Sequence, residues 1–149
     1  MTIYFYHIHE NPYGCFSNFS RHGIELDNQW WPTTEHYFQA QKFVDTPYAE
    51  QIRRAAGPRE AAALGRDRSQ PLRQDWEKVR DEVMFKAVLC KFTTHADLRA
   101  ILLQTGAEKL VEKTTTDYYW GCGLTGNGKN MLGRLLMKVR EQLRSEASA

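Results

Sequence analysis

Strand-like sequence in this chain is confined to positions near its two ends, and nearly everything between them has helical spacing. Residues 2–8 (TIYFYHI) alternate as a half-buried strand does, a short strand is expected at 24–26, and KLVEKT at 109–114 predicts another. A parallel α/β sheet needs strands and helices that alternate along the whole chain, and that alternation is missing. We therefore predict an α+β fold: a single compact domain, mostly helical, with a small β-sheet.

Prolines, small polar residues and glycines set the boundaries of the expected helices. Proline fits the first turn of a helix, Thr and Asp cap its start, and glycine ends it. Asp75 and Thr94 are the expected caps of two helices in the second half of the chain. The expected helices are 32–44, 47–57, 58–65, 75–90, 94–106 and a last one with apolar residues from 132 to 143 on one face.

The length and composition are those of one globular domain. The chain has 149 residues, 42% of them hydrophobic and 26% charged, with a net charge of only +2. Apolar runs last only a few residues, and the N-terminal sequence lacks the basic region and cleavage site of a secretory signal. We expect a cytoplasmic protein with no membrane partner, a domain at 1–145 and a disordered tail at 146–149; no pattern indicates the oligomeric state.

The cysteines and histidines form no recognisable disulfide or metal pattern. Cys15, Cys90 and Cys122 are odd in number and never occur as C-x-x-C. His7 and His9 share one face of a strand, but no third ligand is near in the sequence. The motifs of serine, cysteine and zinc hydrolases are missing too. We therefore expect neither a metal nor a cofactor.

The segment GCGLTGNGKN, residues 121–130, resembles a nucleotide-binding loop without matching it. Gly123, Gly128 and Lys129 fit the P-loop pattern, but Asn130 stands where Ser or Thr would bind magnesium, and no strand follows. Glycines let backbone N–H groups approach an anion, and Lys129 adds a charge near a helix N-terminus. Two interpretations stay open: a metal-free phosphate site, or a flexible, glycine-rich surface loop.

A polar stripe runs along the expected helix in WWPTTEHYFQAQKF, residues 30–43. At 100° per residue, Glu35, Gln39 and Lys42 fall on one face, beside Phe38 and Phe43. An exposed stripe has the same spacing and is one interpretation. The other is the wall of a cleft, which the position of Glu35 directly after an aromatic, proline-containing segment favours.

Arginines gather in the middle of the chain, with only Glu60 and Asp67 as acidic residues among them. Such a group can bind phosphate or nucleic acid, and a solvated surface is the alternative. The arginines are Arg53, Arg54, Arg59, Arg66, Arg68 and Arg73.

Five segments, in matching order, resemble the NADAR superfamily and most closely its YbiA-like members. Together they cover nearly the whole chain, so the resemblance implies a YbiA-like fold throughout. The segments are FSNF (16–19), WPTTEHYFQAQKF (31–43), GRDRSQPLRQDW (65–76), VMFKAVLCKF (83–92) and a C-terminal group of WGCG, GKN and LGRLLMKVR (120–140).

The resemblance implies an N-glycosidase. YbiA-like enzymes cleave the C1'–N bond of ribosylamino-pyrimidine phosphates of riboflavin synthesis and release ribose 5-phosphate. By this resemblance Glu35 is the catalytic carboxylate, Trp76 stacks on the substrate and Asp117 is a second carboxylate. The residues expected to bind the substrate are Asn18, Phe19, Gln39, Lys42, Arg66, Trp120, Gly121, Gly126, Gly128, Lys129 and Asn130.

The wider superfamily offers two alternatives to this ribosyl phosphate substrate. One is a hydrolase that removes ADP-ribose from guanine bases of nucleic acid, whose backbone the arginines would contact. The other is a non-catalytic ADP-ribose-binding module, which has no need of a carboxylate at C1'. The chain also has Cys122 where an acidic residue is usual within WG-x-G. That difference bears on the identity of the substrate more than on the reaction class.

Overall fold

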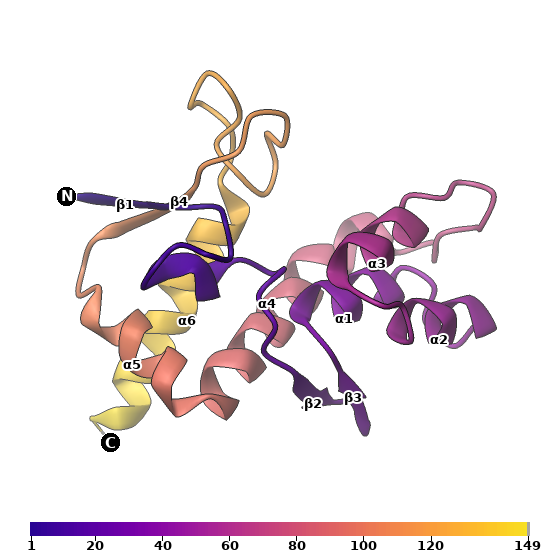
Figure 1. Ribbon diagram of the computed structural model, residues 1–149, viewed down its shortest axis with the longest axis horizontal. Helices are drawn as coiled ribbons and strands as arrows, with labels where there is room; N and C mark the ends of the chain where they lie inside the picture. The colour runs from indigo at the N-terminus through magenta and orange to yellow at the C-terminus, as the bar shows by residue number, and fades with distance from the viewer. Residues whose placement is uncertain (149) are drawn as a thin grey trace. The chain divides into compact units, whose positions relative to one another are not determined.

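The computed structural model of the chain describes residues 1–148 and has the predicted α+β fold, with six α-helices and four short strands among those residues (Figure 1). The strands are β1 (Thr2–Phe5), β2 (Ile24–Leu26), β3 (Gln29–Trp31) and β4 (Lys109–Glu112). The helices are α1 (Thr34–Gln41), α2 (Pro47–Arg53), α3 (Pro58–Gly65), α4 (Trp76–Thr94), α5 (Ala96–Gln104) and α6 (Met131–Ala147). A single 3₁₀ turn, η1, spans Tyr13–Phe16.

The chain divides into two compact units, and the single domain expected at 1–145 stays a prediction. Unit 1 combines Met1–Ser17 with the chain from Phe92 onward, and unit 2 is the continuous segment Asn18–Lys91. Helix α4 begins in unit 2 and ends in unit 1.

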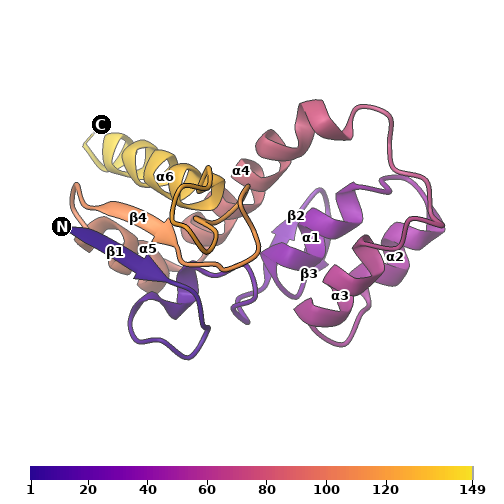
Figure 2. The same cartoon turned by 90° about the horizontal axis from the view of Figure 1, so that it is seen from above.

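Unit 1 is built on a two-stranded parallel sheet. β1 pairs with β4 from Thr2 opposite Lys109 to Phe5 opposite Glu112, and α6 packs against β4 while α5 lies beside α6 (Figures 1 and 2). The aromatic ring of Phe16 packs edge-on against Phe5 at 5.6 Å. These contacts bury the apolar side of β1.

Asn130 joins β4 to the start of α6. Its backbone is left-handed, with φ of 54°. Its side-chain Nδ2 donates to the carbonyl of Leu110 at 2.9 Å, and its Oδ1 accepts from the N–H of Glu112 at 2.9 Å. The side-chain amide therefore continues the ladder as a strand backbone would. Gly133 permits this close approach, because a Cβ there would lie 2.1 Å from the Leu110 carbonyl oxygen.

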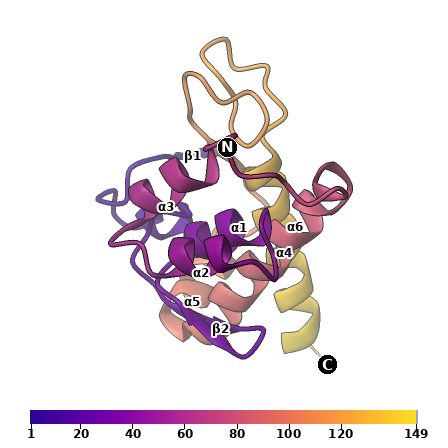
Figure 3. The same ribbon diagram turned by 90° about the vertical axis from the view of Figure 1, so that its right-hand side faces the viewer.

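Unit 2 is organised around α1, against which α2 and α3 both pack (Figure 3). β2 and β3 form an antiparallel hairpin with Ile24 opposite Trp31. Its turn consists of Asp27 and Asn28, both with positive φ, as a tight hairpin turn requires. The Tyr37 hydroxyl donates to Asp27 at 2.7 Å and so ties the hairpin to α1. The buried core includes Ile24, Trp31, Tyr37, Ala40, Ile52 and Ala87.

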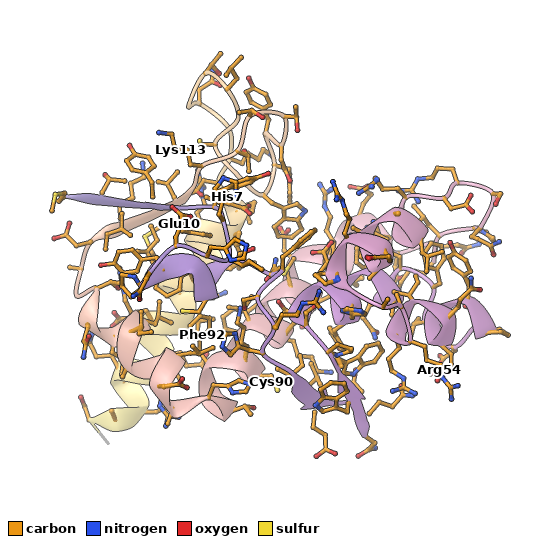
Figure 4. All side chains as sticks on the ribbon, viewed as in Figure 1. His7, Glu10, Arg54, Cys90, Phe92 and Lys113 are labelled. Carbon is orange, nitrogen blue, oxygen red and sulfur yellow. The ribbon has the colours of Figure 1, made fainter. Side chains whose placement is uncertain are left out.

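Most expected elements are present, and the differences have local causes. β1 stops at Phe5 because the N–H groups of Tyr6 and His7 donate to the Glu10 carboxylate, at 2.6 and 2.7 Å, and not to a partner strand; Figure 4 labels His7 and Glu10 at this bend. β3 was not predicted; it lies just before the helix expected at 32–44, and it forms because Trp31 pairs with Ile24.

Several helix ends also differ from the prediction. α1 is shorter than the expected 32–44, and α2 ends at Arg53 and not at 57. α5 starts after His95, so Thr94 is not its cap. α6 continues to Ala147, so Glu146 and Ala147, which we expected in the tail, are helical. Of the expected tail, Ala149 lies outside the described residues. No helix within residues 1–148 has the length and apolar character needed to span a bilayer.

Replacing Asn130 by Ala is expected to lower the free energy of unfolding by about 2–4 kcal/mol, because the buried Leu110 carbonyl and Glu112 N–H each lose their partner. Urea unfolding measures this. Asn130→Gly, which tolerates the positive φ, should be destabilised as well. The exposed Asn127→Ala is the matched control. A wild-type unfolding midpoint for both Asn130 variants would contradict the role assigned to the amide.

Candidate functional site

The predicted site residues divide between the two units, and each group is described within its own unit. Unit 2 contains Asn18, Phe19, Glu35, Gln39, Lys42, Arg66 and Trp76. Unit 1 contains Asp117, Trp120, Gly121, Gly126, Gly128, Lys129 and Asn130.

Glu35 lies in the first turn of α1 and is only 8% exposed. Gln39 Nε2 donates to its Oε2 at 2.7 Å, which orients the carboxylate. The backbone N–H of Glu35 donates to the Asn18 carbonyl at 3.3 Å. The stripe of Glu35, Gln39 and Lys42 is therefore buried, and the interpretation as an exposed helix surface is wrong.

The Gln39 side chain is held where α3 comes closest to α1. A Cβ on Gly65 would lie 1.9 Å from Gln39 Oε1, so only glycine fits without moving the amide. The Gly65 carbonyl accepts from Lys42 Nζ at 3.4 Å and from Arg68 Nη1 at 3.1 Å. The backbone of Gly65 thus lies beside the Gln39 side-chain amide, and its carbonyl binds the two cationic side chains of Lys42 and Arg68.

Lys42 is a buried lysine among positive charges. Its Nζ lies 5.7 Å from the centre of the Phe38 ring. Burial, together with the nearby charges of Arg68 and Arg66, lowers the pKa of Lys42 to about 8, while Glu35 acts in the opposite direction. Arg66 and Arg68 are exposed. A group of cations beside a buried carboxylate is an arrangement that can attract a phosphate and place a general base close to it.

The remaining predicted residues of unit 2 differ in exposure. Asn18 is buried, and its Oδ1 accepts from the Thr34 hydroxyl at 2.9 Å, which fixes the entry to α1. Phe19 is 37% exposed. The ring of Trp76 is buried and packs against Phe38 at 5.0 Å, so it supports the ring beside the Lys42 ammonium.

The glycine segment of unit 1 uses its backbone N–H groups internally. The N–H of Gly126 donates to Gly123, that of Gly128 to Cys122 and that of Lys129 to Tyr118. Those of Asn130, Met131 and Leu132 donate to the carbonyls of Gly121, Tyr119 and Trp120. The prediction that the Gly126 and Gly128 backbone and Asn130 bind phosphate is corrected here: their N–H groups, and the Asn130 amide, already have partners.

Asp117 and Lys129 hold this loop together in different ways. Asp117 Oδ1 accepts from the N–H groups of Tyr119 and Trp120, at 3.0 and 2.8 Å, as an Asx turn does. The Tyr119 and Trp120 rings pack edge-on at 4.9 Å. Lys129 Nζ lies 5.5 Å from the centre of the Tyr119 ring. The exposed Lys129 is the charged group that the loop presents.

Cys122 faces the inside of the same loop. Its thiol is 8% exposed and donates to the carbonyl of Gly123 at 3.4 Å. An acidic side chain in the same position would bring a carboxylate against carbonyl oxygens. The thiol therefore suits this interior better than the acid that the family pattern led us to expect.

Two residues of the unit 2 site were not among the predicted site residues. Arg68 was one arginine among six, and Gly65 was only a helix stop. Their place in the site follows from the contact between α1 and α3, which no local pattern encodes. Within residues 1–148, no three His, Cys, Asp or Glu side chains gather closely enough to hold a metal ion.

His36, next to Glu35, has a structural role. Its Nε2 lies 3.1 Å from the Ala55 carbonyl, so this nitrogen carries the proton, and its Nδ1 accepts from the Thr33 hydroxyl at 2.8 Å. Burial lowers the pKa of His36 below its ordinary value of 6.5. The neutral imidazole therefore anchors the N-terminus of α1.

Stability is expected to fall in acid because of His36. The unfolded chain binds a proton near pH 6.5 while the folded one does not, so this contribution is complete above about 6.5 and is lost as the pH falls toward the lower folded pKa. Urea unfolding of wild type and His36→Gln between pH 8 and 5 tests this. The Gln variant should show the weaker pH dependence, and parallel curves would contradict the assignment.

Comparison with known proteins finds a matching family model, similar sequences and a similar solved structure. The model of the NADAR domain matches residues 4–144. An N-glycosidase of Nostoc punctiforme is 55% identical over 97% of this chain and 94% of its own length. The N-glycosidase YbiA of Escherichia coli is 55% identical over 97% of this chain and 91% of its own length. Its NMR structure superposes with a TM-score of 0.91, covering 99% of this chain and 87% of that one.

A longer relative contains a matching segment. The chloroplastic riboflavin biosynthesis protein PYRR of Zea mays is 43% identical over 88% of this chain, but the match covers only 23% of the maize protein.

Proposed function

Because this chain belongs to the NADAR domain family, we propose that it is an N-glycosidase that hydrolyses the C1'–N bond of ribosylamino-pyrimidine 5'-phosphates and releases ribose 5-phosphate. The observation that carries the proposal is the buried Glu35 carboxylate, oriented by Gln39 and flanked by cations. A module that only bound ADP-ribose would have no use for a fixed carboxylate of this kind.

Hydrolysis breaks the bond between C1' and nitrogen and joins a water oxygen to C1'. Glu35 orients the water and accepts one of its protons, and that proton is then passed to the leaving nitrogen, so that one water is consumed and the free base is released. Positive charge develops on C1' and the ring oxygen of the ribose, and the carboxylate offsets it. Gln39 prevents the Glu35 side chain from rotating away, so the base is in place before the substrate arrives.

The phosphate is assigned to the cations at the Gly65 carbonyl. Lys42 supplies a buried ammonium, and Arg66 and Arg68 supply exposed guanidinium groups that bind phosphate oxygens in a fork. A dianion relieves the repulsion among these three groups. Trp76 acts through Phe38, which it holds beside the ammonium. Asp117 and Lys129 remain proposed substrate contacts from unit 1.

The name of a relative supports the proposal that the substrate contains a pyrimidine, because the matching maize protein is a riboflavin biosynthesis protein. The reaction as written needs no metal or cofactor, and a cytoplasmic location is part of the proposal. An ADP-ribosyl-guanine hydrolase is the alternative, because its substrate also carries a ribose with a 5'-phosphate and a nitrogen on C1'.

Release of ribose 5-phosphate from the ribosylamino-pyrimidine phosphate, in EDTA, is the test of this function. Wild type should turn over, and Glu35→Gln should lose roughly 10²-fold or more in kcat while it retains its fold and its substrate affinity. Glu82→Gln, an exposed carboxylate on α4, is the matched control and should retain full activity.

Three outcomes would contradict the proposal. Turnover of ADP-ribosylated single-stranded DNA in place of the pyrimidine compound would establish the alternative substrate. Activity that appears only when a metal is added would exclude the metal-free mechanism. A near-wild-type kcat for Glu35→Gln would remove Glu35 from the chemistry.

The pH dependence of kcat/KM should report Lys42. The pKa of Lys42 is lowered to about 8, so the ammonium loses its proton, and phosphate binding weakens, as the pH rises through that value. Lys42→Arg keeps its charge and should move this alkaline limb to higher pH, whereas the exposed Lys78→Arg should leave it in place. An unchanged limb in Lys42→Arg would assign it to another group.

A further inference from the structure

A cavity of about 310 Å³ opens in unit 2 away from Glu35. Its lining includes Trp31 at the end of β3, Gln41 at the end of α1 and Glu50 in α2. Gln41 follows Glu35 by six residues and so lies roughly 120° around the helix axis from it. The volume is at the lower end of the range of about 300–1,000 Å³ typical of small-molecule sites.

The amide of Gln41 is the first sign that this cavity binds something. Gln41 is 9% exposed and lines the cavity. Its backbone carbonyl accepts from Arg73 Nη1 at 3.5 Å, but within residues 1–148 its side chain makes no hydrogen bond. A side-chain amide offers two donors and one acceptor, and those of Gln41 are left for groups inside the cavity. Gln41 therefore presents hydrogen-bonding groups of its side chain to a ligand in the cavity.

The charge of the cavity is the second observation that indicates a ligand. Three carboxylates line it, and two are already neutralised. Glu50 pairs with Arg53 and Arg54, each at 2.6 Å; Figure 4 labels Arg54, the residue that follows α2. Asp27 pairs with Lys86 at 2.7 Å.

Asp45 is the third carboxylate of the cavity, and it forms no hydrogen bond or ion pair within the described chain. Arg73, whose charge interacts with Asp45, bonds instead to Asp75 at 2.6 Å. The cavity thus has one carboxylate available for a cation.

We propose that this cavity binds a small organic cation that carries a guanidinium group. The Asp45 carboxylate accepts two parallel N–H groups of the guanidinium fork, and the side-chain amide oxygen of Gln41 accepts a third. Trp31 and Val44 form the apolar wall along an alkyl chain. A simple ammonium lacks the planar fork and cannot make the two parallel bonds to the Asp45 carboxylate. The ligand binds apart from Glu35 and is not the substrate of the proposed hydrolysis.

Agmatine is the probe, and putrescine is its matched control because it replaces the guanidinium with an ammonium on the same four-carbon chain. In ¹H–¹⁵N NMR titrations, agmatine should shift the side-chain amide of Gln41 and the backbone signals of Asp45 and Thr46. Putrescine should bind at least 5-fold more weakly. Glu35→Gln should bind agmatine as wild type does, so failure of the proposed glycosidase and failure of this site can be distinguished.

Two variants test the assigned groups. Asp45→Asn keeps a residue that tolerates the positive φ of 65° at this position but removes the charge, and it should weaken agmatine binding at least 10-fold. Gln41→Leu should weaken it as well, and its dispersed NMR spectrum shows whether it is folded. If Gln41→Leu does not fold, Asp45→Asn alone decides.

Three results would overturn the proposal. The first is the lack of any shift in wild type up to about 10 mM agmatine, a concentration at which even a Kd of about 1 mM nearly saturates. The second is equal binding of agmatine and putrescine. The third is wild-type affinity in Asp45→Asn.

Discussion

The proposed catalytic cluster depends on the close contact between α1 and α3 at Gly65. Because residue 65 has no side chain, the Gln39 amide reaches Glu35, and the same residue's carbonyl accepts from Lys42 and Arg68. The proposed carboxylate base and the cations proposed to bind the phosphate are thereby held by one point of backbone contact. Polar groups can be buried here because each of these bonds replaces one to water.

The glycine-rich loop shows that the same composition can serve packing or ligand binding. Gly121 approaches Thr114, Gly123 lies under the Tyr118 ring with φ of 70°, and Gly128 meets the backbone of Cys122. A Cβ at any of the three would lie within 2.8 Å of those atoms. The glycines let the loop fold onto itself, and the N–H groups of Gly126, Gly128 and Lys129 then donate to carbonyls of the loop itself. The sequence left open whether these groups had a partner in the loop or a bound anion.

Local signals predicted the elements well, and tertiary contacts limited the rest. The helix from Pro58 to Gly65 agrees with the structure at both ends, since proline and glycine act within one turn. β3 escaped prediction because three residues gain strand geometry only by pairing with β2. The spacing of Glu35, Gln39 and Lys42 indicated a common face, but their burial and the part played by Arg68 needed α3. The burial and the bonding partners of such residues depend on contacts between helices and not on helix propensity.

The pairing of β1 with β4 also determines the order in which this chain can fold during synthesis. Thr2 needs Lys109 as its partner, so β1 leaves the ribosome long before its partner strand exists. Unit 2, by contrast, is one continuous segment and has all its residues while β4 is still being made. Unit 2 can therefore fold first, whereas unit 1 must wait until both of its parts have been made. The chain's first residues are thus among the last to acquire their native partners.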